Sequence, residues 1–300
     1  MNRELRELFD DNKLIIKKIT LINDVRIVDT GEEKLVIKKR NTNLEELFKY
    51  LKSRSFDYFP KIIYQTRNYD IYKFINDTKI EPEEKMLDII KIVTLLHNKT
   101  TFYKDIDDDT YKNLYESILE RIDYLYNYYN DIVDIIEEND YMSPSNYLFI
   151  RNVSKLYASL DYAKYQINNW YNIIENKKRI RVVNIHNNLS LEHYLLEERP
   201  YLISWEKSKR DIPIYDLINL YKRYYKEIDF CDMFRIYEGN YPLLEEEKNL
   251  LLCLMSLPEK LEFNEREFSM CKKVSNFYEY INATDRLIND YLPYKTESTI

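Results

Sequence analysis

The sequence predicts an α+β fold, with a small β-rich N-terminal lobe containing one helix and a large, mostly helical C-terminal lobe. Two observations predict this division. The first third alternates short, β-branched apolar runs with Asn-Asp and Gly-Glu turn signals, which is typical of a sheet. After Pro82, apolar residues recur at spacings of three and four, which is typical of helices. The predicted domains are therefore residues 1–75 and 76–300.

Five strands and one helix are expected in the first domain. The helix lies between the third and fourth strands, because its apolar residues have the i, i+3, i+4, i+7 spacing of an amphipathic helix. These residues are Leu44, Leu47, Phe48 and Leu51. The strands are expected at residues 13–21, 24–30, 33–40, 60–66 and 69–75.

Long helices are expected in the second domain. Residues 83–100 have a strong helical pattern, and two apolar stripes follow at residues 114–136 and 153–174. The short polar break at Ser143 and Pro144 separates the stripes, so they predict two antiparallel helices. Only two strands, residues 180–186 and 200–205, are expected to interrupt the helices.

Composition excludes several classes of partner. The net charge is −7 and the pI is near 5.3, which argues against a general nucleic-acid-binding surface. The sequence contains no apolar run long enough to span a membrane, and its charged start differs from a signal peptide. Cys231, Cys253 and Cys271 are odd in number and far apart, as expected of reduced thiols. We therefore expect a cytoplasmic protein without nucleic-acid or membrane partners.

Glycine is scarce and tyrosine abundant, with 2 and 30 residues respectively among 300. Tyr, Asn, Ile and Lys together indicate codon bias from an AT-rich genome. The scarcity of glycine has a physical consequence whatever its origin. Backbone positions that need a positive φ, or that approach a phosphate closely, must be built from other residues.

Several short motifs occur in an order that resembles the protein-kinase-like fold of the aminoglycoside phosphotransferase and choline kinase-like superfamily. The resemblance covers about residues 15–265. The motifs are "LVIK" (35–38), "IYKFI" (71–75), "LLHNKT" (95–100), "HNNLSLEH" (186–193), "LISWE" (202–206) and "RDIPIYDL" (210–217). In that superfamily they correspond to the phosphate-binding lysine strand, the hinge, a helix end, the catalytic loop, the metal strand and the stretch after it.

The spore-coat (CotS-like) branch of this superfamily resembles the sequence in two further features. One is the long helical pair before the loop, and the other is "YPLLEEEKNLLLCLMSLP" at residues 241–258. This resemblance implies protein partners in a spore-coat or similar assembly. It also implies deposition on the forespore or spore coat after synthesis in the cytoplasm.

The resemblance implies a nucleotide site at Lys38, with Glu45 or Glu46 on the next helix as the partner of this lysine. A simpler interpretation exists for each residue. Lys38 belongs to a run of three basic residues and would suit a solvated strand end. Glu45 and Glu46 would also stabilise the helix N-terminus through its dipole.

The catalytic loop departs from the family pattern. His186 matches the histidine that braces the loop, but Asn188 stands where the family has its catalytic aspartate. An amide cannot accept the proton or carry the charge that orients the attacking hydroxyl, and losing a positioned base costs about 10²–10⁴ in rate. Asn187 replaces the glycine after the histidine, and Gly31 is the one glycine in the first domain. A glycine-rich cover for a triphosphate is therefore not expected.

The metal positions depart as well. His193 replaces the metal-binding asparagine of the loop, and Ser204 replaces the aspartate of the metal strand. Imidazole and a neutral hydroxyl are poor ligands for Mg²⁺, which prefers hard oxygen donors. Glu206 is the one carboxylate left, as a weak candidate ligand. A surface or ion-pair role is the simpler interpretation of Glu206.

These departures favour a catalytically degenerate, pseudokinase-like protein that acts by binding, with no cofactor expected. The alternative is an active phosphotransferase that transfers phosphate from Mg-ATP to a small-molecule hydroxyl. Its metal ligands would be relocated to Glu206 with Asp211 or Asp216. A third interpretation is a structural scaffold whose nucleotide pocket is filled by bulky tyrosines.

Overall fold

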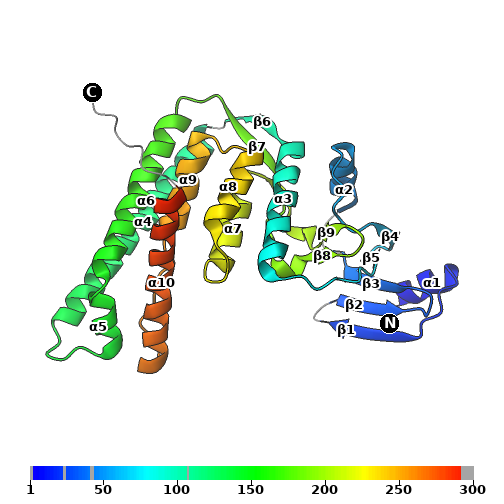
Figure 1. Ribbon diagram of the computed structural model, residues 1–300, viewed down its shortest axis with the longest axis horizontal. Coiled ribbons are helices and arrows are strands. Elements are labelled where there is room, and N and C mark those ends of the chain that lie inside the picture. The colour runs from blue at the N-terminus through cyan, green and yellow to red at the C-terminus, as the bar shows by residue number, and fades with distance from the viewer. Residues whose placement is uncertain (1–2, 23–24, 41–43, 107, 292–300) are drawn as a thin grey trace. The chain divides into compact units, whose positions relative to one another are not determined.

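The computed structural model describes residues 3–22, 25–40, 44–106 and 108–291. A five-stranded antiparallel sheet near the N-terminus and long helices after it confirm the predicted α+β fold (Figure 1). The chain forms two compact units. Unit 1 comprises the chain up to Thr100 together with His186–Lys209, and unit 2 comprises Thr101–Ile185 and the chain from Arg210 onward. These units follow internal contacts, and the lobe boundary at residue 75 stays a prediction.

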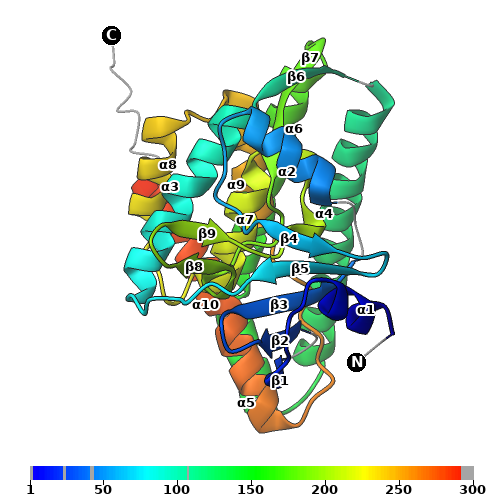
Figure 2. The same ribbon diagram turned by 90° about the vertical axis from the view of Figure 1, so that its right-hand side faces the viewer.

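The sheet of unit 1 has the strand order β1-β2-β3-β5-β4, with every neighbouring pair antiparallel (Figure 2). Its strands are β1 (Lys18–Ile22), β2 (Val25–Asp29), β3 (Lys34–Lys39), β4 (Ile62–Gln65) and β5 (Tyr69–Lys73). Each lies within, or overlaps, a predicted strand. β1 begins later than predicted because Lys13 has a φ of 55° and the Leu14 N–H donates to the Phe9 carbonyl, 2.8 Å away. The chain is still turning there after the preceding helix.

Two helices accompany this sheet before the hinge. The predicted helix is α2 (Leu44–Ser53), and α1 (Arg3–Asp11) is an additional one. The buried side chains of α1, Leu5 and Phe9, pack into one apolar cluster with Val28, Leu35, Ile37 and Ile71 of the sheet. A nine-residue helix with two buried positions has too short an apolar stripe to stand out in a charged sequence.

Alternation along β3 sends its side chains to opposite faces of the sheet. Leu35 and Ile37 belong to the apolar cluster under α1. Val36 and Lys38 line a cavity on the other side. Because successive strand residues point in opposite directions, the burial of Ile37 dictates where Lys38 points.

The segment His186–Lys209 belongs to unit 1, along with α3 (Pro82–Thr100). The segment contains the short elements η1 (Leu191–His193), β8 (Tyr194–Leu196), β9 (Pro200–Leu202) and η2 (Trp205–Lys207). Backbone hydrogen bonds connect the β8–β9 hairpin to the rest of unit 1. The Thr78 N–H donates to the Leu196 carbonyl at 2.7 Å, and the Leu202 N–H donates to the Tyr58 carbonyl at 2.8 Å.

Helices make up most of unit 2. They are α4 (Asp108–Glu137), α5 (Pro144–Ile150), α6 (Val153–Ile174), α7 (Ile214–Tyr224), α8 (Phe230–Asn240), α9 (Glu245–Ser256) and α10 (Glu267–Tyr291). The two predicted stripes lie on α4 and α6, which run side by side (Figure 1). Tyr115 donates to Asn168 at 2.7 Å, and the Lys164 ammonium donates to Asp123 at 2.9 Å. Early residues of α4 thus meet late residues of α6, so the pair is antiparallel as predicted.

The expectation that only two strands interrupt the helices was wrong. Besides the two predicted strands, now β7 (Arg179–Ile185) and β9, the described residues include β6 (Phe102–Asp105), β8 and β10 (Lys209–Asp211). β10, β7 and β6 form a three-stranded sheet in that order. Strands of three or four residues are too short for an alternating pattern to be recognised. None of the described helices is long and apolar enough to cross a membrane.

A buried ion pair holds β7 against the start of α9 in unit 2. The Arg181 guanidinium donates through Nε to Glu247 at 2.9 Å, also contacts the second carboxylate oxygen, and donates to the Pro242 carbonyl at 2.8 Å. The Glu247 side chain is 1% exposed and the Arg181 side chain 10%. The Tyr241 ring lies 4.3 Å from the guanidinium carbon. Tyr241 and Glu247, which belong to the 241–258 segment, therefore have a structural role.

We predict that Glu247→Leu lowers the free energy of unfolding by about 3–5 kcal/mol, because Arg181 would keep its buried charge without a partner. The measurement is urea unfolding followed by circular dichroism. The matched control is Glu279→Leu, which removes a half-exposed carboxylate 2.6 Å from Lys226 and should cost less than about 1 kcal/mol. Equal losses in the two variants would contradict the prediction.

Candidate functional site

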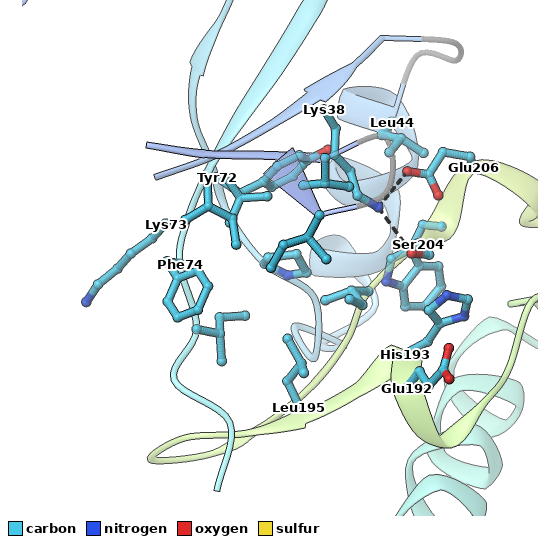
Figure 3. A pocket seen from close by; sticks show the side chains of 18 of the residues that line it. Lys38, Leu44, Tyr72, Lys73, Phe74, Glu192, His193, Leu195, Ser204 and Glu206 are labelled. Atoms are coloured by element: carbon cyan, nitrogen blue, oxygen red, sulfur yellow. Dashed lines mark hydrogen bonds and ion pairs between the residues drawn. The ribbon is translucent and has the colours of Figure 1, made fainter. Parts of the chain in front are cut away.

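A cavity of about 350 Å³ lies within unit 1, on the face of the sheet to which Val36 and Lys38 point. Its walls are mostly apolar and come from the sheet, from α2, from the hinge residues 72–75 and from the segment His186–Lys209 (Figure 3). Ligand sites typically have volumes of about 300–1,000 Å³ with a few polar groups among apolar walls. The lining residues used below are Ile27, Val36, Lys38, Phe48, Tyr72, Lys73, Phe74, Glu192, His193, Leu195, Ser204, Trp205 and Glu206.

Lys38 joins the sheet to the segment that follows β9. Its ammonium donates to Ser204 Oγ at 3.1 Å and to Glu206 Oε1 at 3.0 Å (Figure 3). The side chains of Lys38 and Glu206 are 21% and 29% exposed, so solvent screens this ion pair only in part. The structure thus brings three of the predicted site residues together at one end of the cavity.

Trp205 fixes the position of Ser204 and Glu206. Its indole is 1% exposed and donates through Nε1 to the Leu202 carbonyl at 2.7 Å. Phe48 of α2 and Phe59 stack on each other and meet Trp205 edge-on, with ring centroids 6.3 and 6.4 Å away. Such aromatic contacts hold the tryptophan in one orientation. The residues on either side of it therefore have little freedom.

The structure does not bring Glu45 or Glu46 to Lys38. Glu45 forms an i,i+4 ion pair with Lys49 at 2.7 Å, and its pKa is lowered mainly by the hydrogen bond from that lysine. Glu46 is exposed on the same helix. Glu46 lies two positions before Phe48, on another face of α2, whereas Glu45, three positions before Phe48, is held by its ion pair with Lys49. Glu206 has the place next to Lys38 that the resemblance assigned to a glutamate of this helix.

His186 lies under the loop. It is fully buried, its Nε2 lies 3.0 Å from the Ile203 carbonyl, and its ring meets the Trp205 ring edge-on at 4.5 Å. Asn188 lies close by, where its side-chain Nδ2 donates to the Ser204 carbonyl at 3.4 Å. Both contacts run from residues 186–188 to residues 203–204. The role of His186 as a brace of the loop stays a prediction.

His193 lies at the cavity wall, where its Nδ1 donates to the Asn188 carbonyl at 2.6 Å. Its backbone N–H donates to the Ser190 hydroxyl at 3.2 Å, which caps η1. The imidazole is thereby oriented by the loop itself. Glu192 precedes it and is exposed.

Tyr72 forms part of the cavity wall. Burial raises the pKa of its hydroxyl, and the carboxylates of Asp70 and Glu206 raise it further. The phenol is therefore neutral at physiological pH. The scaffold interpretation expected bulky tyrosines to fill this space, but a cavity is present with Tyr72 at its side.

The donor set of this site does not fit Mg²⁺. Ser204 Oγ and Glu206 Oε1 both accept from the Lys38 ammonium, so a cation already lies between the two candidate oxygen ligands. Asp211 and Asp216, the relocated ligands of the alternative, belong to unit 2. Across the described parts of the chain, no group of three or more His, Cys, Asp or Glu side chains is placed to hold a metal ion.

The sequence named Lys38, Ser204 and Glu206 but missed the pairing among them. Lys38 and Glu206 are 168 positions apart, so local spacing contains no signal for their contact. The apolar wall of the cavity was not predicted either, although the alternation of residues along β3 indicates which side chains form it. Val36 stands between two core residues and has to face the opposite side with Lys38.

No family model and no curated protein sequence matches this chain. Solved structures do match it. An aminoglycoside phosphotransferase from Alicyclobacillus acidocaldarius is similar with a TM-score of 0.67 at 10% identity, over 93% of each chain. Spectinomycin phosphotransferase APH(9)-Ia, in an AMP-bound complex, is similar with a TM-score of 0.51 at 12% identity, over 95% of this chain and 93% of that one. The same enzyme with ADP and spectinomycin gives 0.51 at 14% identity, over 94% and 98%.

These likenesses confirm the predicted kinase-like fold. The chain has the architecture of the aminoglycoside phosphotransferases, with a small antiparallel sheet in the N-terminal lobe and a mostly helical C-terminal lobe. The roles of individual site residues stay predictions.

The loop and the metal strand each contain a residue in the left-handed region. Asn187 has a φ of 57° and Ser204 a φ of 66°. Asparagine tolerates this region better than most residues, and a β-branched residue tolerates it poorly. Asn187 thus has a positive φ at the position where the resemblance implies a glycine.

We predict that Asn187→Val is less stable than Asn187→Gly by about 1–2 kcal/mol, because both lose the side-chain bond to the Lys207 carbonyl but only valine is strained. The free energies of unfolding in urea measure this difference. Asn187→Gly itself should stay close to the natural chain. Two variants of equal stability would show that the left-handed backbone does not constrain this position.

Proposed function

We propose that the chain is a kinase-fold protein that binds an adenine nucleotide in the cavity of unit 1 and does not transfer its phosphate. One observation carries the proposal. The Lys38 ammonium lies between Ser204 and Glu206 at the end of a mostly apolar cavity, in a site whose loop has an amide at the position of the base. This observation supports nucleotide binding without phosphoryl transfer.

The cavity supports a nucleotide as ligand class. It has apolar walls from the sheet and the hinge, and an ion pair at one end, which suits a flat heterocycle that carries polar groups. Spectinomycin phosphotransferase, which shares the fold, has been crystallised with AMP and with ADP. We extend that ligand class to this chain.

The loop chemistry supports the absence of transfer. In phosphoryl transfer, a carboxylate orients the attacking hydroxyl and metal ions neutralise the phosphates. Asn188 has an amide, and its nitrogen already donates to the Ser204 carbonyl. At the metal positions, His193 and Ser204 have an imidazole and a hydroxyl, which Mg²⁺ does not favour. Base and metal ligands are therefore replaced together.

We further propose that binding serves an assembly, with protein partners in a spore coat or its maturation machinery. The support is the resemblance of the helical pair and of residues 241–258 to the spore-coat branch. The corresponding location is the cytoplasm, with deposition on the forespore or spore coat.

An active small-molecule phosphotransferase is the second candidate. The observation that favours it is that Lys38 and Glu206 line the same cavity, as a working nucleotide site would require. In that case Glu206 would release Lys38 and hold the magnesium ion of Mg-ATP. The two candidates differ in turnover, which can be measured.

We predict that isothermal titration detects binding of ATP, and that no phosphate is transferred to a panel of amino alcohols, sugars and aminoglycosides. The missing base alone lowers the rate by about 10²–10⁴. Asn188→Asp should also stay inactive, because the metal ligands would still be missing.

The matched variant is Asn188→Ala, which removes the amide but leaves the cavity intact. Turnover by the natural chain that disappears in Asn188→Ala would overturn the proposal and favour the active phosphotransferase. Absence of any binding by adenine ligands would overturn the nucleotide site itself.

A further inference from the structure

We propose that this cavity recognises the nucleoside part of its ligand, and that neither a divalent metal ion nor the phosphates add to the affinity. The inference rests on the proposed function and names the feature of the ligand that is recognised. Its basis is that the Lys38 ammonium, which lines the cavity, already pairs with the Glu206 carboxylate.

The first step concerns the metal ion. A divalent cation would need the oxygens of Ser204 and Glu206, and both accept hydrogen bonds from the Lys38 ammonium at 3.1 and 3.0 Å. An ion entering there would meet a positive charge within bonding distance of its ligands. The Lys38 ammonium therefore occupies the position where the two oxygen ligands converge, and it excludes a divalent cation from that position.

The second step concerns the phosphates. Among the residues that the structure describes, the charged side chains lining the cavity are two lysines and two glutamates, whose formal charges cancel. Of these, the Lys73 side chain extends away from the cavity (Figure 3). A phosphate close to Lys38 would also be close to the Glu206 carboxylate, which repels it. A phosphate that displaced Glu206 would leave a partly buried carboxylate without its partner, which is unfavourable.

The third step concerns what remains for recognition. Ile27 and Val36 of the sheet and Phe74 and Leu195 from other elements supply apolar walls, and the neutral Tyr72 hydroxyl supplies a polar group. The volume of about 350 Å³ lies near the lower end of ligand sites. Burial of a heterocycle between these walls therefore provides most of the affinity.

The test is calorimetric titration of the full chain with adenosine, AMP, ADP and ATP at constant ionic strength, first with EDTA and then with excess Mg²⁺. We expect the four dissociation constants to agree within about threefold, and magnesium to leave each unchanged. A gain of about tenfold or more from the added phosphates, or from magnesium, would overturn the inference and leave the proposed nucleotide site intact.

A single substitution tests the cause. Glu206→Gln keeps the size of the side chain and an oxygen for Lys38 but removes the repelling charge. We expect Glu206→Gln to lower the ratio of the ATP dissociation constant to the adenosine dissociation constant about tenfold. The removal of one charge repulsion of moderate strength corresponds to a change of this size. Adenosine binding shows that the variant is folded.

Glu7→Gln is the matched control, because it neutralises an exposed glutamate paired with Arg3 in the same unit. It should leave both affinities unchanged. An unchanged ratio of ATP to adenosine affinity in Glu206→Gln would overturn the inference. Failure of all four ligands to bind the natural chain would overturn the proposed function and this inference with it.

Discussion

The ion pair between Lys38 and Glu206 is the interaction on which the rest of the site depends. Each partner follows a buried residue in the sequence. Ile37 is buried in the cluster under α1, so the next residue points toward the cavity. Trp205 is buried, packs against the rings of Phe48, Phe56, Phe59 and His186, and donates to the Leu202 carbonyl, so its packing positions the residue after it. Packing on both sides thus places opposite charges 3.0 Å apart.

Scarcity of glycine shapes the same region. The loop and the metal strand both require left-handed backbone, and Asn187 and Ser204 provide it. Each of these residues also forms a hydrogen bond through its side chain, Asn187 to the Lys207 carbonyl and Ser204 to the Lys38 ammonium. The strained backbone is therefore compensated by contacts that glycine could not form.

Much of the fold follows from periodicity, and much of the site does not. The apolar stripes on α4 and α6 and the β-branched run of β3 are strong local signals, and these two helices and this strand were predicted. The helix α1 and the short strands β6, β8 and β10 were missed because they contain too few residues to show a period. Lys38, His186, Asn188 and Ser204 could be named from a resemblance. The partner of Lys38 could not, because its contact with Glu206 depends on how distant segments pack.

The central claim is that the Lys38 ammonium takes the place of a metal ion between Ser204 and Glu206. The most direct test is the anomalous difference map of a crystal grown with ATP and excess Mn²⁺. The account predicts bound adenosine density with no manganese peak at Ser204 and Glu206, and Lys38 still within hydrogen-bonding distance of both. A manganese ion coordinated by Glu206, with Lys38 moved onto the phosphates, would contradict it.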